Sequence, residues 1–369
     1  MTSEPILIHG APDLSADLFH AVPASIIDPF LYLEDGDKSA ATVSVLDASK
    51  VRALGIEVLD PYTLGRDELL KQGLPPDAIE NELALRACRV AGIFSAAVPR
   101  EFPVGVADHL RENGVKLRVD ADVFVARRRQ KSGFQLEGIR RAQKAADAAM
   151  RRAAELIRRL DPGLTAEAVR EQMQAICDEH DCELADDVIV AHGGQSADGH
   201  EPGHGAIGRG EPVVVDIWPR DKRSRCWADM TRTFVAGGGE PADELAEYWR
   251  LTRESLELVY PEVRAGADAQ AIFRRSCEPF IAAGKPTQLT KRDGEVLRDG
   301  YFHGLGHGVG LEVHERPGLG RTPDTLVAGD VITLEPGCYR QGYGGCRLED
   351  LVVVTEDGCE TLTDFPYDL

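Results

Sequence analysis

Two β-rich runs, each turning back on itself and each carrying two carboxylates, constrain this sequence more than any other feature. The first, PVVVDIWPRDKRSRCWADMTRTFV, covers residues 212–235, and the second, DVITLEPGCYRQGYGGCRLEDLVVV, covers residues 330–354. In both runs apolar and β-branched residues flank a polar or glycine-bearing centre, a pattern typical of a β-hairpin. The sequence therefore predicts two hairpins in its second half.

In the first hairpin, Asp216 and Asp229 lie symmetrically about Lys222 and Arg223. A simple hairpin would place these two carboxylates opposite each other, with Cβ atoms about 4.5–5.5 Å apart. At that separation they repel unless a proton or a cation lies between them. One such pair is more often simply solvated, so the first hairpin leaves both a metal site and a hydrated surface open.

The second hairpin repeats the arrangement. Glu335 and Glu349 are symmetric about Gly342, and Gly344 and Gly345 would allow the chain to reverse. Four carboxylates embedded in apolar strands are hard to explain as solvated surface, because buried strand faces rarely carry charges without partners. We therefore interpret the two pairs as candidate metal ligands.

Three histidines, His303, His307 and His314, lie between the hairpins in the segment YFHGLGHGVGLEVHERPG. The spacing of the first two resembles the zinc motif HExxH, but that motif needs a helix and a Glu after its first His. The closely spaced glycines favour an extended, tightly packed segment instead. Beside four carboxylates, these histidines are candidates for a ligand or catalytic role, with a structural role as the alternative.

Ligand chemistry narrows the choice of metal. Carboxylates with one imidazole suit Mn²⁺ or a similar divalent ion better than a zinc site built on thiolates. Because carboxylates bridge, four of them and one His suffice for two ions about 3.5–4 Å apart, between which a water would lose a proton near neutral pH. We expect two divalent ions, with Mn²⁺ as the first choice and Co²⁺ or Zn²⁺ as alternatives.

The remainder of the chain divides by composition. Residues 1–125 alternate short apolar runs with helical patches and predict a small α/β domain, with strand candidates at 40–46, 91–94 and 117–119. Residues 126–162 are rich in Ala, Leu, Glu, Arg and Lys, with apolar residues at three- and four-residue spacing, and predict a long amphipathic linker helix. In an acidic chain, Arg127-Arg128-Arg129 at this junction indicates a solvated or salt-bridged linker more than a nucleic-acid patch.

The third part, residues 163–369, is predicted to be an α+β domain in which helices cover a mainly antiparallel sheet. Thr165 is the expected N-cap of its first helix. Helices are expected at 165–178, 241–263 and 268–283, and strands at 212–217, 226–235, 310–314, 330–335 and 346–355.

Composition excludes several function classes. The formal net charge of −20 over 369 residues disfavours nucleic acid or an anionic membrane as the main partner. No run of about eighteen apolar residues marks a membrane span, and the first residues do not resemble a secretory signal. The eight cysteines form no CxxC pair, so we expect reduced thiols and a cytoplasmic location.

The motifs VVVDIWP, ADMTRTF, HGLGHGVGLEVHE, TLEPGCY and GGCRLEDLV, in this order, resemble the pita-bread metallopeptidase family, which includes methionine aminopeptidase, aminopeptidase P and prolidase. The likeness spans the chain from about residue 130 to its end. The leading domain and linker helix are similar to the prolidase (Xaa-Pro dipeptidase) and aminopeptidase P branch. The resemblance implies a pita-bread catalytic domain with a pseudo-twofold repeat and a homodimer.

The resemblance also implies roles for individual residues. Asp216 would bind one metal ion, Asp229 and Glu349 would bridge both, and His307 and Glu335 would complete the second. Glu335 would also carry the proton from the attacking water to the leaving nitrogen.

Further residues would support this set. His303 and His314 would orient the scissile carbonyl, and His200, with nearby His204 as the competing choice, matches an upstream pocket histidine. Arg347 would support the bridging carboxylate, and Thr231 would do the same for Asp229.

Two departures from the family pattern lie near the expected substrate pocket. Trp218, followed by Pro219, stands where the family usually has Gly, and His200 is not in the usual Pro-His setting. Both leave the metal set intact and indicate a divergent subfamily.

The leading hypothesis is a metal-dependent Xaa-Pro dipeptidase acting on a small peptide with proline in second position. A dipeptidase needs a cation for the substrate's free carboxylate, and Arg316 or Arg321 could supply it. The runner-up is an Xaa-Pro aminopeptidase acting on longer peptides. A non-catalytic binding module is the alternative from another class, although such a module has no need to keep all five ligands. A metal-free amidinohydrolase like creatinase conflicts with the same residues.

Overall fold

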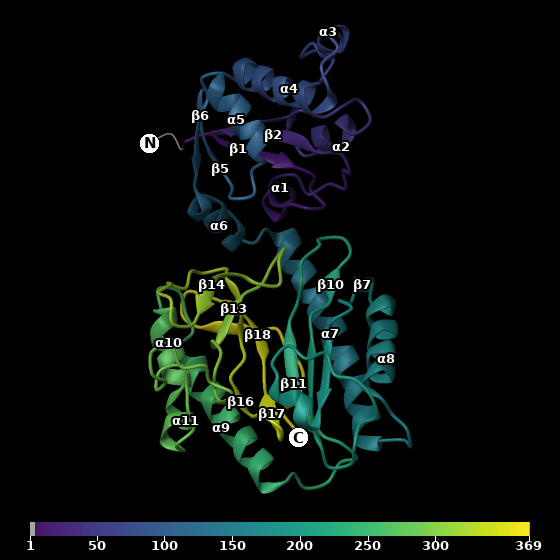
Figure 1. Ribbon diagram of the computed structural model, residues 1–369, viewed down its shortest axis with the longest axis vertical. Coiled ribbons are helices and arrows are strands. Elements are labelled where there is room, and N and C mark those ends of the chain that lie inside the picture. The colour runs from purple at the N-terminus through teal and green to yellow at the C-terminus, as the bar shows by residue number, and fades with distance from the viewer. Residues whose placement is uncertain (1–3, 369) are drawn as a thin grey trace. The chain divides into compact units, whose positions relative to one another are not determined.

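The computed structural model describes residues 4–368. It divides the chain into two compact units, one ending at Arg128 and the other beginning at Arg129 (Figure 1). Each unit has its own hydrophobic core. None of the helices within residues 4–368 is long and apolar enough to cross a membrane.

The first unit is built on a six-stranded mixed sheet with strand order β4-β3-β2-β1-β5-β6. Its strands are β1 Ile6–Gly10, β2 Phe30–Asp35, β3 Lys38–Ala41, β4 Glu57–Val58, β5 Ser95–Val98 and β6 Lys116–Val119. Its helices are α1 Ala16–Ala21, α2 Ala48–Ala53, α3 Arg66–Lys71, α4 Pro76–Ala91, α5 Val104–Glu112 and α6 Ala121–Arg129. Leu7 and Leu33 lie in one hydrophobic cluster while Ile8 and Tyr32 lie in another. Because neighbouring strand residues face opposite sides, the sheet is covered on both faces, and the expected small α/β domain is confirmed.

Two of the three strand candidates in this unit need revision. The strand expected at 117–119 is confirmed as part of β6, but β3 ends at Ala41, well before residue 46. The strand expected at 91–94 is wrong, because Ala91 is the last residue of α4. Gly92 then ends that helix in a left-handed conformation, with φ of 72°, and β5 begins three residues later.

The predicted continuous helix over 126–162 is interrupted. Helix α6 ends at Arg129, and α7 (Gly133–Arg159) begins after Ser132, whose side chain forms a reciprocal capping box with Gln135. The arginine run is ion-paired, as predicted: Arg127 contacts Glu34 within the first unit at 2.5 Å. Arg129 donates to Asp330 within the second unit at 2.6 and 2.8 Å.

The second unit contains four small sheets, in which every pairing of the named strands is antiparallel. Their orders are β11-β9-β8, β14-β13-β15-β18-β19, β12-β16-β17 and β10-β7. The strands are β7 Cys182–Glu183, β8 Ile189–His192, β9 Pro212–Ile217, β10 Arg220–Asp221, β11 Met230–Val235, β12 Asp299–Gly300, β13 Gly306–Gly308, β14 Glu315–Leu319, β15 Val331–Leu334, β16 Gly337–Arg340, β17 Gly344–Arg347, β18 Asp350–Val354 and β19 Cys359–Thr361.

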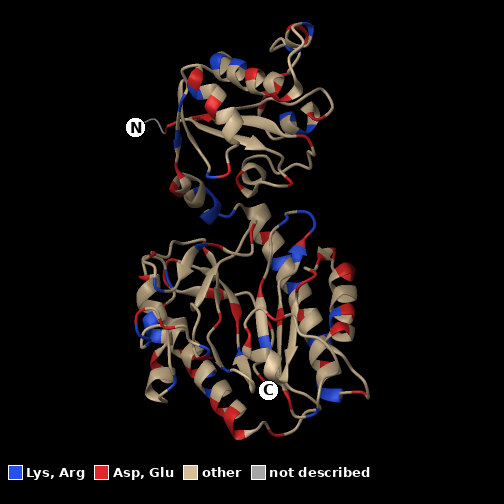
Figure 2. Ribbon diagram, viewed as in Figure 1, with Lys and Arg blue, Asp and Glu red and all other residues tan. Residues whose placement is uncertain are grey.

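Helices cover this set of sheets in two groups (Figure 1). Besides α7, the helices of the unit are α8 Ala166–Glu179, α9 Asp243–Val259, α10 Ala269–Ser276 and α11 Glu278–Ala282, with 3₁₀ turns η1 Gly193–Ala197 and η2 Tyr260–Glu262. Helices α7 and α8 share a core with β8, β9 and β11, whereas α9 to α11 share a second core with β15 to β18. The predicted α+β architecture is confirmed, and Figure 2 shows acidic residues on its central strands as well as on its outer helices.

Local predictions in this unit are mostly confirmed. Thr165 caps α8 by accepting a hydrogen bond from the amide of Ala168, and the strand expected at 212–217 is β9. The helix expected at 268–283 is broken into α10 and α11. The strand expected at 310–314 is wrong, because those residues form the turn between β13 and β14.

Candidate metal centre

The first acidic hairpin, β9 and β11, has a register that differs from the predicted one. Asp216 pairs with Thr231, so the prediction that it directly opposes Asp229 is wrong by two residues. The cause is the turn, because a bridge between Arg220 and Trp227 centres the reversal one residue later than expected. A shift of two residues keeps a side chain on the same face, so Asp216 and Asp229 are diagonal neighbours on one face.

The second acidic hairpin has the predicted register. Leu334 pairs with Asp350, and Gly337 pairs with Arg347. Both pairs are symmetric about Gly342, whose φ is +80°, so Glu335 and Glu349 face each other between the two ladders. The prediction of opposed glutamates is confirmed.

Gly344 and Gly345 do not make this turn. They lie in β17, where a Cβ atom would come within 2.6 Å of Pro212 Cγ and 2.2 Å of Tyr339 Cδ1 respectively. These glycines allow close packing beside the acidic pair, and the reversal itself occurs at Gly342.

Strand β13, between β14 and β15, carries His307 in the extended, tightly packed segment that its glycines predict. A Cβ atom at Gly306 would lie 2.0 Å from the carbonyl oxygen of Thr333, and one at Gly308 would lie 2.4 Å from that of Arg316. His307 Nδ1 lies 3.1 Å from the carbonyl oxygen of Gly308. Since a carbonyl only accepts, Nδ1 carries the proton, and Nε2 keeps its lone pair for another partner.

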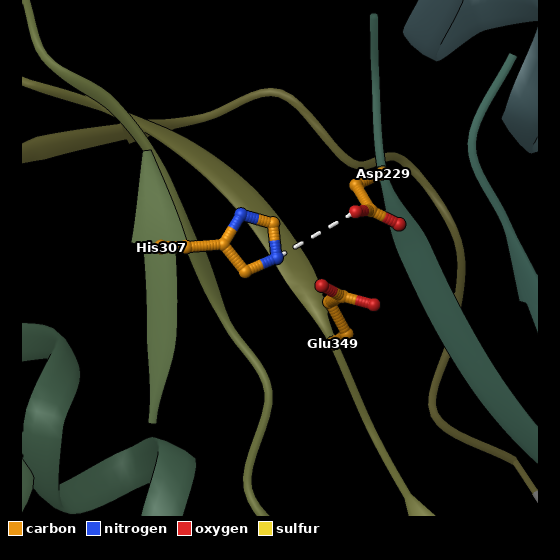
Figure 3. Close-up of side chains that lie close together, drawn as sticks. All are labelled: Asp229, His307 and Glu349. Carbon is orange, nitrogen blue, oxygen red and sulfur yellow. Dashed lines mark ion pairs between the residues drawn. The ribbon is translucent and has the colours of Figure 1, made fainter. Parts of the chain in front are cut away.

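That lone pair faces the acidic residues. His307 Nε2 lies 3.8 Å from Asp229 Oδ2 and 3.5 Å from Glu335 Oε1. One ligand atom from each of Asp229, His307 and Glu349 falls within 4.8 Å of the others. Figure 3 shows the three side chains converging from β13, from the residue before β11 and from the link between β17 and β18.

Two oxygens in this cluster have no protein partner. Within residues 4–368, Asp216 Oδ1 and Asp229 Oδ1 are buried and accept no hydrogen bond. Buried carboxylate oxygens are normally hydrogen-bonded or bound to a cation. The donor set, rich in oxygen with one imidazole, therefore fits divalent metal ions.

A cavity of about 880 Å³ opens onto this cluster. Its size suits a short peptide. It is lined by all five proposed ligands, together with residues that include His200, His303, His314, Trp218, Phe302 and Arg347.

Sequence comparison decides the family. The model of metallopeptidase family M24 matches residues 137–356, more than half of the chain. The chain belongs to metallopeptidase family M24. Prolidase structures share the fold of this M24 chain, so the pita-bread fold predicted from its motifs is confirmed.

Named M24 relatives are peptidases. The probable dipeptidase PepE of Mycobacterium tuberculosis is 31% identical over 286 residues, covering 76% of this chain and 70% of the relative. The Xaa-Pro dipeptidase of Pyrococcus horikoshii is 30% identical, over 74% of each chain. The crystal structure of a prolidase from Pyrococcus horikoshii superposes with a TM-score of 0.78 at 25% identity, covering 98% of this chain and 94% of the prolidase.

Burial and mutual repulsion raise the pKa values of three carboxyl groups among the proposed ligands. Burial raises the pKa of Asp229 well above its usual range, and repulsion from Glu349 adds to it. Glu349 is shifted upward for the same two reasons, with Glu335 as its repelling neighbour, and burial raises the pKa of Glu335 to about 8. Burial and the neighbouring His314 lower the pKa of His307 to about 4. Without positive charge between them these carboxyl groups hold protons, and bound cations would displace those protons.

Arg347 hydrogen-bonds the carboxylate of Asp216, and not that of Glu349, which it was expected to support. Its Nη2 donates to Asp216 Oδ2 at 2.6 Å, and its Nη1 donates to the hydroxyl of Tyr339 at 3.0 Å. Thr231 Oγ1 donates to Glu349 Oε2 at 2.7 Å, so the threonine expected to support Asp229 contacts Glu349 instead.

Tyr339 is a member of this network that the sequence reasoning missed. Its hydroxyl accepts from Arg347 and lies 2.9 Å from His303 Nε2, so the hydroxyl proton is donated to that nitrogen. His303 Nδ1 lies 2.8 Å from the carbonyl oxygen of Gly304 and donates to it. Its position in the quoted TLEPGCY motif was the one signal that could have drawn attention to Tyr339.

Both ring nitrogens of His303 are therefore engaged within the protein. Burial and the neighbouring Arg347 lower the pKa of His303 to about 3, so the ring stays neutral. In this structure His303 has no ring nitrogen left to contact a scissile carbonyl. The direct contact between His303 and the substrate that the resemblance implies is therefore not supported.

The remaining predicted residues separate into two groups. His200 lines the cavity, whereas His204 is exposed beside Glu201, 3.3 Å away. The ring of His314 lies 4.3 Å from that of His307. Arg316 is not among the described residues that line the cavity, and its Nε donates to Asp324 Oδ2 at 3.0 Å. The expectation that Arg316 binds the substrate carboxylate therefore lacks structural support.

Proposed function

We propose that this M24 peptidase is a metal-dependent Xaa-Pro dipeptidase. The observation that carries the proposal is the convergence of Asp229, His307 and Glu349 at the floor of a peptide-sized cavity, beside unpartnered carboxylate oxygens. The Xaa-Pro dipeptidase of Pyrococcus horikoshii, similar over most of both chains, supports the choice of substrate.

Five residues would hold two divalent ions, with Mn²⁺ as the first choice. Asp216 would bind one ion, Asp229 and Glu349 would contact both, and His307 and Glu335 would complete the second. When bound, such ions lower the pKa of water and polarise a carbonyl.

The side chains around these ligands would move and orient the reacting groups. Glu335 would take a proton from the attacking water and deliver it to the proline nitrogen, which is a poor leaving group until protonated. Within the described residues, the ring nitrogens of His200 and His314 make no hydrogen bond and remain able to orient the scissile carbonyl. Arg347 and Tyr339 would hold Asp216 in place.

One observation favours Xaa-Pro aminopeptidase activity as the second candidate. Among the described residues lining the cavity, Arg347 is the sole Lys or Arg, and it already donates to Asp216 and Tyr339. A dipeptide's carboxylate would then depend on histidine, whereas a longer peptide has no charge at that position.

Hydrolysis of Ala-Pro and of Ala-Pro-Ala by the Mn²⁺-loaded protein separates the two candidates. Cleavage of Ala-Pro at a rate equal to or above that of the tripeptide supports the dipeptidase. Rapid cleavage of the tripeptide alone would replace it with the aminopeptidase, and Ala-Ala serves as the control for proline dependence.

A further inference from the structure

Arg232 is a buried cation on β11, on the opposite face from the metal centre. Its neighbour Thr231 faces the proposed ligands and donates to Glu349. Because successive strand residues alternate, Arg232 points into the protein behind the site, where it is almost completely buried. A buried guanidinium must be fully paired to be tolerated.

The guanidinium is paired on its inner side with the backbone of the proposed metal centre. Nη1 donates to the carbonyl oxygen of Glu349 at 2.7 Å and to that of Thr231 at 2.9 Å. The amide of Glu349 in turn donates to the Thr231 carbonyl at 3.0 Å. Arg232 therefore fixes the backbone of Glu349 at the junction between the sheet containing β11 and the sheet containing β18.

The outer side of the same guanidinium is held by residues 365–367. Nη2 donates to the carbonyl of Phe365 and Nε to that of Pro366, at 2.8 and 2.9 Å. The ring of Tyr367 lies 4.5 Å from the guanidinium carbon.

Asp350 completes the arrangement. One of its oxygens accepts from Arg232 Nη2 at 2.8 Å, and the other accepts from the hydroxyls of Tyr260 and Tyr367. Asp350 directly follows Glu349. Arg232 therefore holds the chain at two adjacent points, the carbonyl of Glu349 and the side chain of Asp350. Each polar group of the pair has a partner, which makes the unit stiff.

We infer that residues 365–367, acting through Arg232, position Glu349 so that its carboxylate can be shared by two metal ions. Arg232 is a positioning residue in this scheme, since it touches neither substrate nor metal. A bridging carboxylate must present both oxygens at once, so a small rotation of its backbone weakens two contacts together. The inference rests on the proposed metal set.

Two substitutions test the inference, one at Arg232 itself and one, more conservative, at Tyr367. Arg232→Lys keeps the charge but cannot donate to Glu349, Phe365 and Pro366 together. Tyr367→Phe removes a single hydroxyl and keeps the ring over the guanidinium, so the fold is expected to survive. Tyr343→Phe is the matched control, because it likewise removes one buried tyrosine hydroxyl, at a residue outside the 365–367 segment.

Binding of Mn²⁺ is measured by calorimetry, and the low-temperature electron paramagnetic resonance spectrum reports whether two ions are exchange-coupled through shared ligands. We expect Arg232→Lys to weaken Mn²⁺ binding about 10–100-fold, as loss of a residue supporting a ligand typically does, and to reduce the coupled signal. Tyr367→Phe should produce a smaller loss in the same direction, with kcat lowered and KM unchanged. Tyr343→Phe should match the wild type.

The outcomes are separable. If the wild type binds two coupled ions, and Glu349→Gln abolishes the coupling, the proposed metal set stands. Wild-type affinity and coupling in Tyr367→Phe and in folded Arg232→Lys would then overturn the positioning role alone. If Arg232→Lys does not fold, Tyr367→Phe decides. A wild type that binds no Mn²⁺ would overturn the metal set itself.

Discussion

Arg347 donates to one oxygen of Asp216 at 2.6 Å, while the other oxygen of the same carboxylate is buried without a protein partner. The guanidinium thus fixes the carboxylate in one rotamer and leaves one oxygen directed at the proposed metal position. A lysine at this position would keep the charge but could not reach Asp216 and Tyr339 together.

Arg347→Lys is therefore expected to lower kcat/KM and Mn²⁺ affinity by about 10–100-fold, the usual effect of losing a residue that supports a metal ligand. Arg340→Lys is the matched control, because Arg340 pairs with the half-buried Glu244 away from the cavity. Equal activity of the two variants would show that Arg347 does not support the metal ligands.

Tyr339→Phe tests the hydrogen bonds that engage His303. Removing the buried hydroxyl leaves Arg347 Nη1 and His303 Nε2 without their partner, at a cost of about 1–3 kcal/mol in the free energy of unfolding. Activity should fall as Asp216 loses its support. Tyr343→Phe is a sharp control, since the Tyr343 hydroxyl is buried and unbonded, and its removal should leave stability unchanged or raised. Denaturant unfolding and steady-state kinetics of both variants check the prediction.

The stability of the metal-free protein should fall as pH rises from about 7 to 8. Glu335 has a folded-state pKa of about 8 against an ordinary value of 4.5, so between these values the folded protein holds a proton on Glu335 that the unfolded chain has lost. Above the ordinary histidine pKa of 6.5 this lowers stability as pH rises, and the raised pKa values of Asp229 and Glu349 act in the same direction. Below 6.5 the lowered pKa values of His303 and His307 oppose the decrease, because the unfolded chain then binds protons that these buried rings do not.

Metal should reverse this trend. Because Mn²⁺ displaces the same protons, its stabilising effect on the melting temperature should grow from pH 5 to pH 8. Calorimetric binding in buffers of different ionisation enthalpy should detect proton release at pH 7. A metal-free melting temperature that rises between about pH 7 and pH 8 would contradict the assigned shifts.

Gly306→Ala should displace His307 without altering any ligand. The new Cβ would lie 2.0 Å from the carbonyl oxygen of Thr333, a backbone atom that cannot move aside cheaply. Overpacking of this kind costs about 1–3 kcal/mol. Gly318→Ala on the neighbouring strand, opposite His307, meets no atom within 4 Å and should behave as the wild type. Thermal unfolding and Mn²⁺ affinity of the pair provide the comparison.

Sequence periodicity predicted the elements that depend on local signals. The capping Thr165 marked the start of α8, and the symmetry about Gly342 correctly opposed Glu335 and Glu349. The break between α6 and α7 required weighing Ser132 and Gln135 as a capping box against a long helical pattern.

Contacts between residues far apart in the sequence were not predicted. The engagement of His303 depends on Tyr339, thirty-six residues away. The pairing of Arg316 with Asp324, and of Thr231 with Glu349 instead of Asp229, are likewise set by how distant strands meet. Residue type and spacing identified which groups gather at the centre, but not which of their atoms remain free.

The diagonal placement of Asp216 and Asp229 limits how the connection between their strands can change in length. Side chains alternate along β11, so adding or deleting one residue within 221–226 would turn Asp229 away from Asp216 if β11 slides along β9 to take up the change. Adding or deleting two would slide it along the same face. When the strand register takes up a change in loop length, an even number of residues keeps the two carboxylates on one face, and an odd number places them on opposite faces.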